Sequence, residues 1–291
     1  MRSQTGTCDT APPGIDEVDP VQAAVTVATR FGLTAAQPVV MSDSNNVVVW
    51  LAPAPIVAKV GAGHHRRLAH ELAVADYLTL GAPVISPAKQ LPREVHRCDG
   101  SEMTFWDYQP QLVGEIAPDD LARALFELHR ALARYDGEIP SYRDELCAVR
   151  AVLTEPSRLT ALGEGDRHLL SSRLDSLLAA LELQRPSRRV LHGSPHDSNV
   201  IVVSEAPRFI DFETVCVGPV EWDLAHVASD VARAYPGPWD TETLRLCRGL
   251  VSVKTATWCW VSVDHPGMRW HAEHHLECAR QCAPRRTEGP Q

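Results

Sequence analysis

The sequence predicts an α+β fold with a small, strand-rich first lobe and a larger, mainly helical second lobe. Three observations lead to this prediction. Apolar runs with the character of antiparallel strands gather in the first third of the 291 residues. Segments with helical periodicity dominate after about residue 109, and a compact island of strands interrupts them at 189–212. Strands and helices that are segregated along a chain in this way favour an α+β arrangement.

The chain divides into three parts by composition. Residues 1–20 are rich in Pro, Asp, Thr and Gly without periodicity, which predicts a flexible tail. The strand-rich lobe is expected at 21–108 and the helical lobe at 109–285. No internal repeat or low-complexity segment interrupts this order.

The first lobe begins with a helix over about 21–31. Apolar runs at 47–51 and 56–60 then flank the turn Ala-Pro-Ala-Pro and predict a β-hairpin. A long helix is expected at about 64–80, because apolar residues recur there at helical spacing and Gly-Ala-Pro at 81–83 ends the pattern.

The second lobe begins with a helix whose acidic first turn, Asp119 and Asp120, suits the helix dipole. Its apolar stripe consists of Leu121, Leu125, Leu128 and Leu132. A further helix is predicted at about 166–183, and the chain after 212 is expected to be helical again.

Composition excludes several classes of protein. A hydrophobic fraction of 44% with 22% charged residues is typical of a globular protein. The net charge of −9 argues against a general nucleic-acid binder. No run reaches the roughly 18–20 apolar residues that a membrane span needs, and residues 1–20 do not have the pattern of a secretory signal. The expected compartment is the cytoplasm.

The eight cysteines form no CxxC pair and are expected to be reduced, mostly buried thiols. Four residues near the C-terminus, His271, His275, Cys278 and Cys282, share one helix face and could offer soft metal ligands. One straight helix cannot close a tetrahedral site over three turns, so packing is the preferred interpretation. A helical metal-binding protein remains the weakest of three hypotheses for function.

The strand island carries the clearest chemistry. Residues 200–203 run out and 208–210 run back around a Pro-containing turn, which predicts a second hairpin. Asn199 and Asp211, 12 residues apart, then lie side by side at its open end. An amide oxygen and a carboxylate are hard ligands that suit Mg²⁺ holding substrate phosphates.

Two motifs and a block that follows them resemble a known family. Residues 192–199 read His-Gly-Ser-Pro-His-Asp-Ser-Asn, residues 210–213 read Ile-Asp-Phe-Glu, and Glu-Trp-Asp-Leu-Ala follows at 221–225. Together they resemble the signature of aminoglycoside phosphotransferases and their choline-kinase-like relatives. The resemblance implies a bilobal protein-kinase-like fold, ATP and Mg²⁺ as cofactors, and transfer of the γ-phosphate to a hydroxyl of a small-molecule acceptor.

The resemblance extends upstream, over roughly 38–235. It implies that Lys59, on a strand, holds the nucleotide phosphates and that Glu71, on the following helix, fixes Lys59.

The same resemblance assigns two further nucleotide contacts. Ser44 and Asn45, in a polar turn, stand where a phosphate-covering loop is expected. Asp107 and Tyr108 stand in the linker whose backbone meets adenine in such enzymes.

One position departs from the family pattern. Ser194 occupies the place of the aspartate that orients or accepts the acceptor's proton, and a serine hydroxyl is not basic near neutral pH. Three interpretations stay open. Asp197 or His196 serves as the base, the acceptor needs little help from a base, or the chain is a pseudokinase that binds nucleotide without transfer.

Other residues of the motifs have mainly structural interpretations. His192 and His196 are expected to hold the loop backbone through hydrogen bonds. Asp223 is expected to brace the helix after the metal-binding segment. Glu213 could reach a metal ion or water.

Overall fold

The computed structural model describes residues 19–43, 46–61, 65–110 and 114–282. The chain divides into two compact units, one made of Met1–Leu68 and Ala88–Tyr108, the other of Ala69–Pro87 and Gln109–Gln291. Residues 69–87, which the sequence places in the first lobe, therefore belong to the second unit. The expected tail at 1–18 lies outside the described residues.

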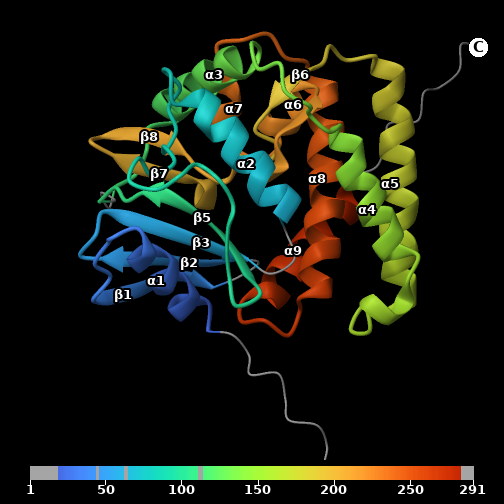
Figure 1. The fold of residues 1–291 in the computed structure, drawn as a ribbon. Helices are drawn as coiled ribbons and strands as arrows, with labels where there is room; N and C mark the ends of the chain where they lie inside the picture. Colours follow the sequence, from blue (N-terminus) through green and yellow to red (C-terminus); the bar gives the residue numbers. More distant parts are fainter. Residues whose placement is uncertain (1–18, 44–45, 62–64, 111–113, 283–291) are drawn as a thin grey trace, which may run out of the picture. The chain divides into compact units, whose positions relative to one another are not determined.

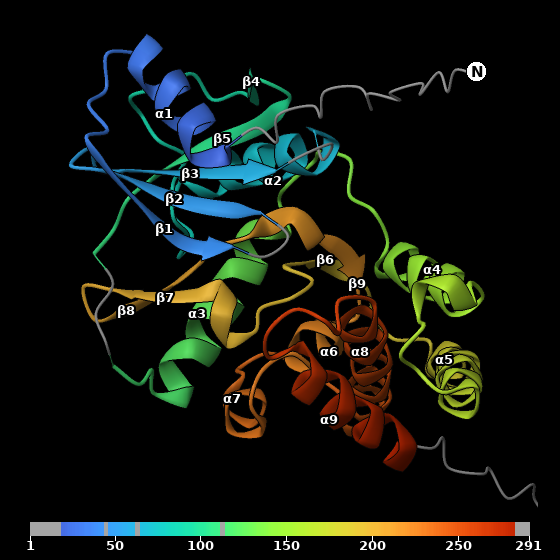
Figure 2. The ribbon, with the colours of Figure 1, turned by 90° about the horizontal axis from the view of Figure 1, so that it is seen from below.

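The first unit contains a five-stranded antiparallel sheet with strand order β1-β2-β3-β5-β4. Figure 2 shows α1 lying against one face of this sheet. The elements are α1 (Pro20–Arg30), β1 (Gln37–Asp43), β2 (Val47–Ala52), β3 (Ile56–Gly61), β4 (His96–Cys98) and β5 (Ser101–Asp107). The first predicted hairpin is confirmed as β2–β3, in which Val49 lies opposite Ala58.

Helix α1 begins where its sequence provides a cap. The Asp19 carboxylate accepts a hydrogen bond of 2.9 Å from the Val21 N–H, and Pro20 occupies the first helical position. The buried face of the helix, which includes Ala24 and Val27, joins the apolar core of the first unit beneath the sheet. Small side chains on this face let the helix pack closely against the strands.

The second unit is mainly helical. Its helices are α2 (His65–Leu78, part of this unit from Ala69), α3 (Pro118–Leu132), α4 (Tyr142–Leu153), α5 (Glu164–Gln184), α6 (Val220–Leu224), α7 (Ser229–Ala234), α8 (Thr241–Val261) and α9 (Met268–Gln281). Figure 1 shows α8 lying between α5 and α9, and both neighbours contact it. Leucines such as Leu177 on α5 and Leu250 on α8, both fully buried, belong to the core of this unit.

Two short strand pairs interrupt the helices. They are β6 (Arg189–Leu191) with β9 (Cys216–Gly218), and β7 (Val200–Val203) with β8 (Ala206–Phe209). Short 3₁₀ turns, η1 (Pro156–Arg158), η2 (Asp197–Asn199) and η3 (Phe212–Thr214), complete the unit. The β7–β8 pair is the second predicted hairpin, with one difference: Ala206 and Pro207, expected in the turn, lie in β8. The turn is Ser204-Glu205, and both residues have positive φ, as a tight hairpin turn requires.

The predicted stripe of α3 is buried, because Leu121, Leu125, Leu128 and Leu132 are each at most 5% exposed. Among the described residues, no helix is both long enough and apolar enough to cross a membrane.

Candidate active site

The open end of the β7–β8 hairpin brings the two residues of the predicted magnesium pair close in space. The Ile210 N–H donates a hydrogen bond of 3.0 Å to the Asn199 carbonyl oxygen, which extends the β ladder by one step beyond the strands. Asp211 follows with φ +66° and ψ +70°, the left-handed region that non-glycine residues rarely adopt. Such backbone strain persists only where the surroundings enforce it, and it is common at functional sites.

The side chain of Asn199 has a fixed orientation. Its Nδ2 donates a hydrogen bond of 2.9 Å to the Ser194 carbonyl oxygen, and its own backbone N–H donates to the His196 carbonyl oxygen. Because the amide nitrogen is engaged in this way, the carbonyl oxygen Oδ1 is the atom that can bind a cation.

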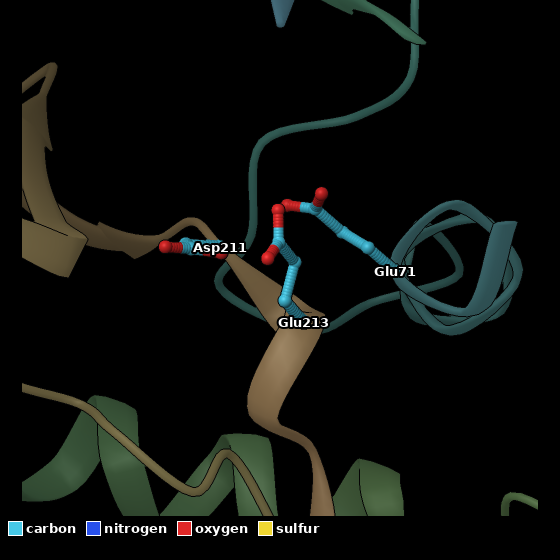
Figure 3. A group of neighbouring side chains, drawn as sticks. All are labelled: Glu71, Asp211 and Glu213. Carbon is cyan, nitrogen blue, oxygen red and sulfur yellow. The ribbon is translucent and has the colours of Figure 1, made fainter. Parts of the chain in front are cut away.

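Three carboxylates meet at the same end of the hairpin. Oxygens of Glu71, Asp211 and Glu213 lie within 4.8 Å of one another (Figure 3). Glu71 comes from α2 and is 1% exposed, while Glu213 lies in the 3₁₀ turn directly after Asp211. A group of hard oxygen donors at this spacing has the chemistry that Mg²⁺ prefers. The residues present therefore fit a divalent cation.

Asp223 on α6 braces the loop that leads to Asn199. Its carboxylate is fully buried and accepts hydrogen bonds of 2.9 Å from the His192 N–H and 2.8 Å from the Gly193 N–H. It also accepts a bond of 2.8 Å from Nε2 of His129 on α3. A buried carboxylate with several donors is a strong local constraint. The expected bracing role of Asp223 thus extends to the loop itself.

A second contact continues this network. Nδ1 of His129 lies 2.8 Å from the Tyr235 hydroxyl, which can donate to it because Nε2 carries the proton given to Asp223. Burial raises the pKa of Tyr235 to about 12, so the hydroxyl keeps its proton at neutral pH. The network holds α3, α6 and the loop together.

His192 stabilises the loop by linking Ser194 to Ile210 through hydrogen bonds. Its Nε2 donates a hydrogen bond of 3.0 Å to the Ile210 carbonyl oxygen, and its Nδ1 accepts one of 3.3 Å from the Ser194 N–H. Burial lowers the pKa of His192, although the nearby Asp223 and Asp211 oppose this. A neutral ring is the form that makes both bonds.

A buried lysine contacts residues that support the same loop. Nζ of Lys254 on α8 lies 3.0 Å from Nε2 of His226 and 5.4 Å from the centre of the Trp222 ring. The Trp222 indole in turn donates a bond of 3.1 Å to the Gly193 carbonyl oxygen. Burial and the charge of Lys254 lower the pKa of His226 well below its ordinary value, which keeps the ring neutral as an acceptor for Nζ.

The candidates for a base lie on the outer side of the loop. Ser194 is half-buried, whereas His196 and Asp197 are exposed. Nε2 of His196 lies 3.4 Å from Nδ2 of Asn199. Desolvation of the ring by the surrounding loop, together with the charge of Lys254, lowers the pKa of His196.

The family of the chain follows from a match that covers most of its sequence. The family model "Phosphotransferase enzyme family" (APH) matches residues 39–249, which is more than half of the chain. The chain belongs to this family. No curated protein matches the sequence.

Solved structures agree with this membership in the APH family. The GDP complex of aminoglycoside 2'-phosphotransferase-IIIa is 13% identical, with a TM-score of 0.66 over 91% of this chain and 99% of that chain. Amicoumacin kinase hAmiN, in complex with AMP-PNP, Ca²⁺ and Ami, is 12% identical, with a TM-score of 0.68 over 89% and 93%. Choline kinase LicA from Streptococcus pneumoniae is 14% identical, with a TM-score of 0.67 over 89% and 98%. At these identities the likeness shows the fold, and the predicted kinase-like α+β fold is confirmed.

The first unit of this APH-family chain holds the other predicted nucleotide contacts. Lys59 lies on β3 and is 8% exposed, whereas its predicted partner Glu71 belongs to the second unit. Burial raises the pKa of Asp107, although the charge of Lys89 opposes this. Ser44 and Asn45 lie outside the described residues.

Tyr108 is more constrained than the sequence suggests. Its backbone N–H donates a hydrogen bond of 2.9 Å to the Pro55 carbonyl oxygen, and its ring stacks on Trp50 with ring centres 4.3 Å apart. The N–H of Tyr108 is therefore already engaged, and its ring is held against Trp50 on β2.

The His/Cys face of α9 does not form a three-ligand group. Within the part of the chain that the structure describes, the residues that gather as possible metal ligands are Glu71, Asp211 and Glu213. On α9 the Cys278 sulfur lies 3.7 Å from Nε2 of His274, and the ring of His274 stacks on the exposed Trp270.

Sequence reasoning missed two parts of the site. The sequence places His129 only within a helix of the second lobe, and it assigns no role to Lys254. The available signals were a histidine in the last turn of an amphipathic helix and a lysine within an apolar helical stretch. Neither signal indicates which residue is its partner in space.

Proposed function

We propose that this APH-family protein uses ATP and Mg²⁺ to transfer the γ-phosphate to a hydroxyl of a small molecule. The observation that carries the proposal is the group of Glu71, Asp211 and Glu213 carboxylates, beside an Asn199 amide whose oxygen is left to bind a cation. Phosphoryl transfer depends mainly on positioning and on neutralising phosphate charge.

In this proposal the cation is held by Asn199 and Asp211, with Glu213 as a further oxygen donor. When bound, Mg²⁺ would supply the charge that phosphate oxygens require. Lys59 would hold the phosphates from the first unit. The Asp223 brace keeps the loop in place, so that Asn199 loses little conformational freedom on binding.

The resemblance implies that this chain differs from its family at the step that removes the acceptor's proton. Ser194 occupies the usual place of the base, and Asp197 is an exposed carboxylate two residues before Asn199. We assign Asp197 as the group that takes the proton. General-base assistance is worth about 10²–10⁴-fold, so transfer without an aspartate at 194 would be slow and not abolished.

A nucleotide-binding protein without transfer is the second candidate, and Ser194 is the observation that favours it. The bracing network and the carboxylate group would serve both functions equally, because they position a nucleotide and a cation. Only turnover separates the two candidates.

Binding is tested first, by thermal unfolding with and without millimolar Mg·ATP. We expect a rise in Tm that requires magnesium and disappears in Asp211→Asn, since a ligand stabilises in proportion to the logarithm of its concentration over Kd. The control is Asp175→Asn on α5, an exposed carboxylate that should keep the full rise. No rise in the wild type would overturn the proposal, and an unchanged rise in Asp211→Asn would overturn the assignment of the metal site.

Transfer is then tested with Ser194→Asp. ADP formation from ATP, with water as acceptor and then with kanamycin, hygromycin B and choline, should increase about 10²-fold or more over the wild type while nucleotide affinity changes little. If Asp197 is the base, Asp197→Asn should reduce the wild-type rate further. A Ser194→Asp protein that binds Mg·ATP but shows no turnover would favour the nucleotide-binding module.

A further inference from the structure

A pocket of about 270 Å³ opens in the second unit, apart from the residues of the candidate active site. It lies between the start of α4, the end of α5 and the loop that enters β6. Three arginines line it: Arg143, Arg185 and Arg188.

The charges in the pocket do not cancel. The lining contains three guanidinium groups and one carboxylate, Glu182, whose Oε1 pairs with Nη1 of Arg143 at 2.8 Å. Two positive charges remain in excess among the lining residues. Arginine is the residue that binds carboxylates and phosphates through paired hydrogen bonds.

One donor in the pocket lining lacks a partner. The Nε of Arg143 is buried and has no hydrogen-bond partner, although its Nη1 is bound to Glu182. A buried donor without an acceptor is unfavourable. Because Nε itself is buried, an oxyanion in the pocket would meet the exposed part of the Arg143 side chain, which is 35% exposed, together with the exposed Arg185 and Arg188.

The remaining wall is mainly apolar, although the Tyr142 hydroxyl interacts with the Arg143 side chain. Leu181 and Tyr142 are 1% and 2% exposed, and Pro186 completes the lining. Arg185 ends α5 in the left-handed conformation, at φ +48° and ψ +50°, immediately before that proline. A ligand with a carbon body next to its charged group would contact both kinds of surface.

We propose that this pocket binds a small phosphomonoester, with the phosphate on the three arginines and the carbon body against Leu181, Tyr142 and Pro186. The site does not depend on the nucleotide-binding function proposed above, because it shares no residue with the candidate active site.

The proposal is tested by isothermal titration with phenyl phosphate at constant ionic strength, without divalent cations. Arg188→Gln removes an exposed cation from the lining and should weaken binding about tenfold, which is the value of one charge-assisted hydrogen bond. Glu182→Gln keeps the size of the side chain, removes the competing carboxylate and should tighten binding several-fold. A gain of affinity cannot result from misfolding.

The matched control is Arg158→Gln, on the exposed turn η1 outside the pocket, which should bind phenyl phosphate as the wild type does. Equal affinities in Arg188→Gln, Glu182→Gln and the wild type would mean that the probe binds elsewhere, including the candidate active site, and would overturn the proposal. Absence of binding at millimolar phenyl phosphate would overturn it as well.

Discussion

Gly193 is the residue at which the geometry of the loop permits least change. Its φ is +90°, and a Cβ at this position would collide with the carbonyl oxygen of Thr214. The strain of a positive φ alone costs about 1–3 kcal/mol for a residue with a side chain. We therefore expect Gly193→Ala to lower the free energy of unfolding by at least about 2 kcal/mol, measured by urea denaturation.

A second glycine provides the control for that measurement. Gly165, in the first turn of α5, has no heavy atom within 4 Å of its Cβ position. Gly165→Ala should leave stability unchanged or raise it by up to about 1 kcal/mol, because alanine restricts the unfolded chain. Equal losses in the two variants would show that the loop tolerates a side chain at 193.

Single residues of the site were predictable to the extent that their partners are close in sequence. Asn199 and Asp211 could be placed together because a hairpin of known length joins them. Glu71 and Asp211 are 140 positions apart in the sequence. Their spacing therefore could not predict that Glu71 joins the carboxylate group. The resemblance implies that Glu71 is functional and fixes Lys59, and that pairing stays a prediction.

The short helix α6 contacts the loop through Trp222 and Asp223, and Asp223 makes most of the hydrogen bonds. Asp223 accepts three hydrogen bonds inside the core, from the His192 N–H, the Gly193 N–H and Nε2 of His129. Asp223→Asn replaces one acceptor oxygen by an amide N–H that faces donors. We expect a loss of about 3–5 kcal/mol in the free energy of unfolding, as for other broken buried pairs.

Asp175→Asn is the matched substitution on an exposed element. Asp175 pairs with Arg150 on the surface, where both side chains are at least 45% exposed. Such pairs contribute about 0–1 kcal/mol, so this variant should unfold almost as the wild type does. If Asp223→Asn were equally mild, the brace would contribute little to the fold.

Elements were predictable where a local pattern was complete. Both hairpins and the stripe of α3 follow from alternation, turn residues and helical spacing. Helix α4 was not predicted, although Ser141 and Asp144 form a capping box at its start and give a recognisable signal. The pocket lined by Arg143, Arg185 and Arg188 could not have been predicted, because it requires the start of α4 to lie beside the end of α5, about 40 residues later.

At the scale of the whole molecule, histidines whose pKa is lowered determine how stability responds to acid. Desolvation by the surrounding protein is the largest cause that lowers the pKa of five histidines in the second unit: His70, His192, His196, His226 and His275. The unfolded chain therefore binds more protons than the folded chain once the pH falls below about 6.5. We expect the Tm to be highest near or above neutral pH and to fall steadily between pH 6.5 and 5.

His275 permits a quantitative test of this dependence. Burial, with the charges of His274 and His271, lowers its pKa to about 4, so its stabilising contribution is complete above pH 6.5 and is lost as the pH falls towards 4. The loss is of the order of 2 kcal/mol after allowance for solvent. His275→Gln should flatten the fall of Tm between pH 6.5 and 4.5, whereas His265→Gln, at an exposed position, should leave the slope as it is. Parallel slopes in both variants and the wild type would mean that His275 titrates alike in the folded and unfolded chain, and that the acid response comes from the loop histidines or from carboxylates.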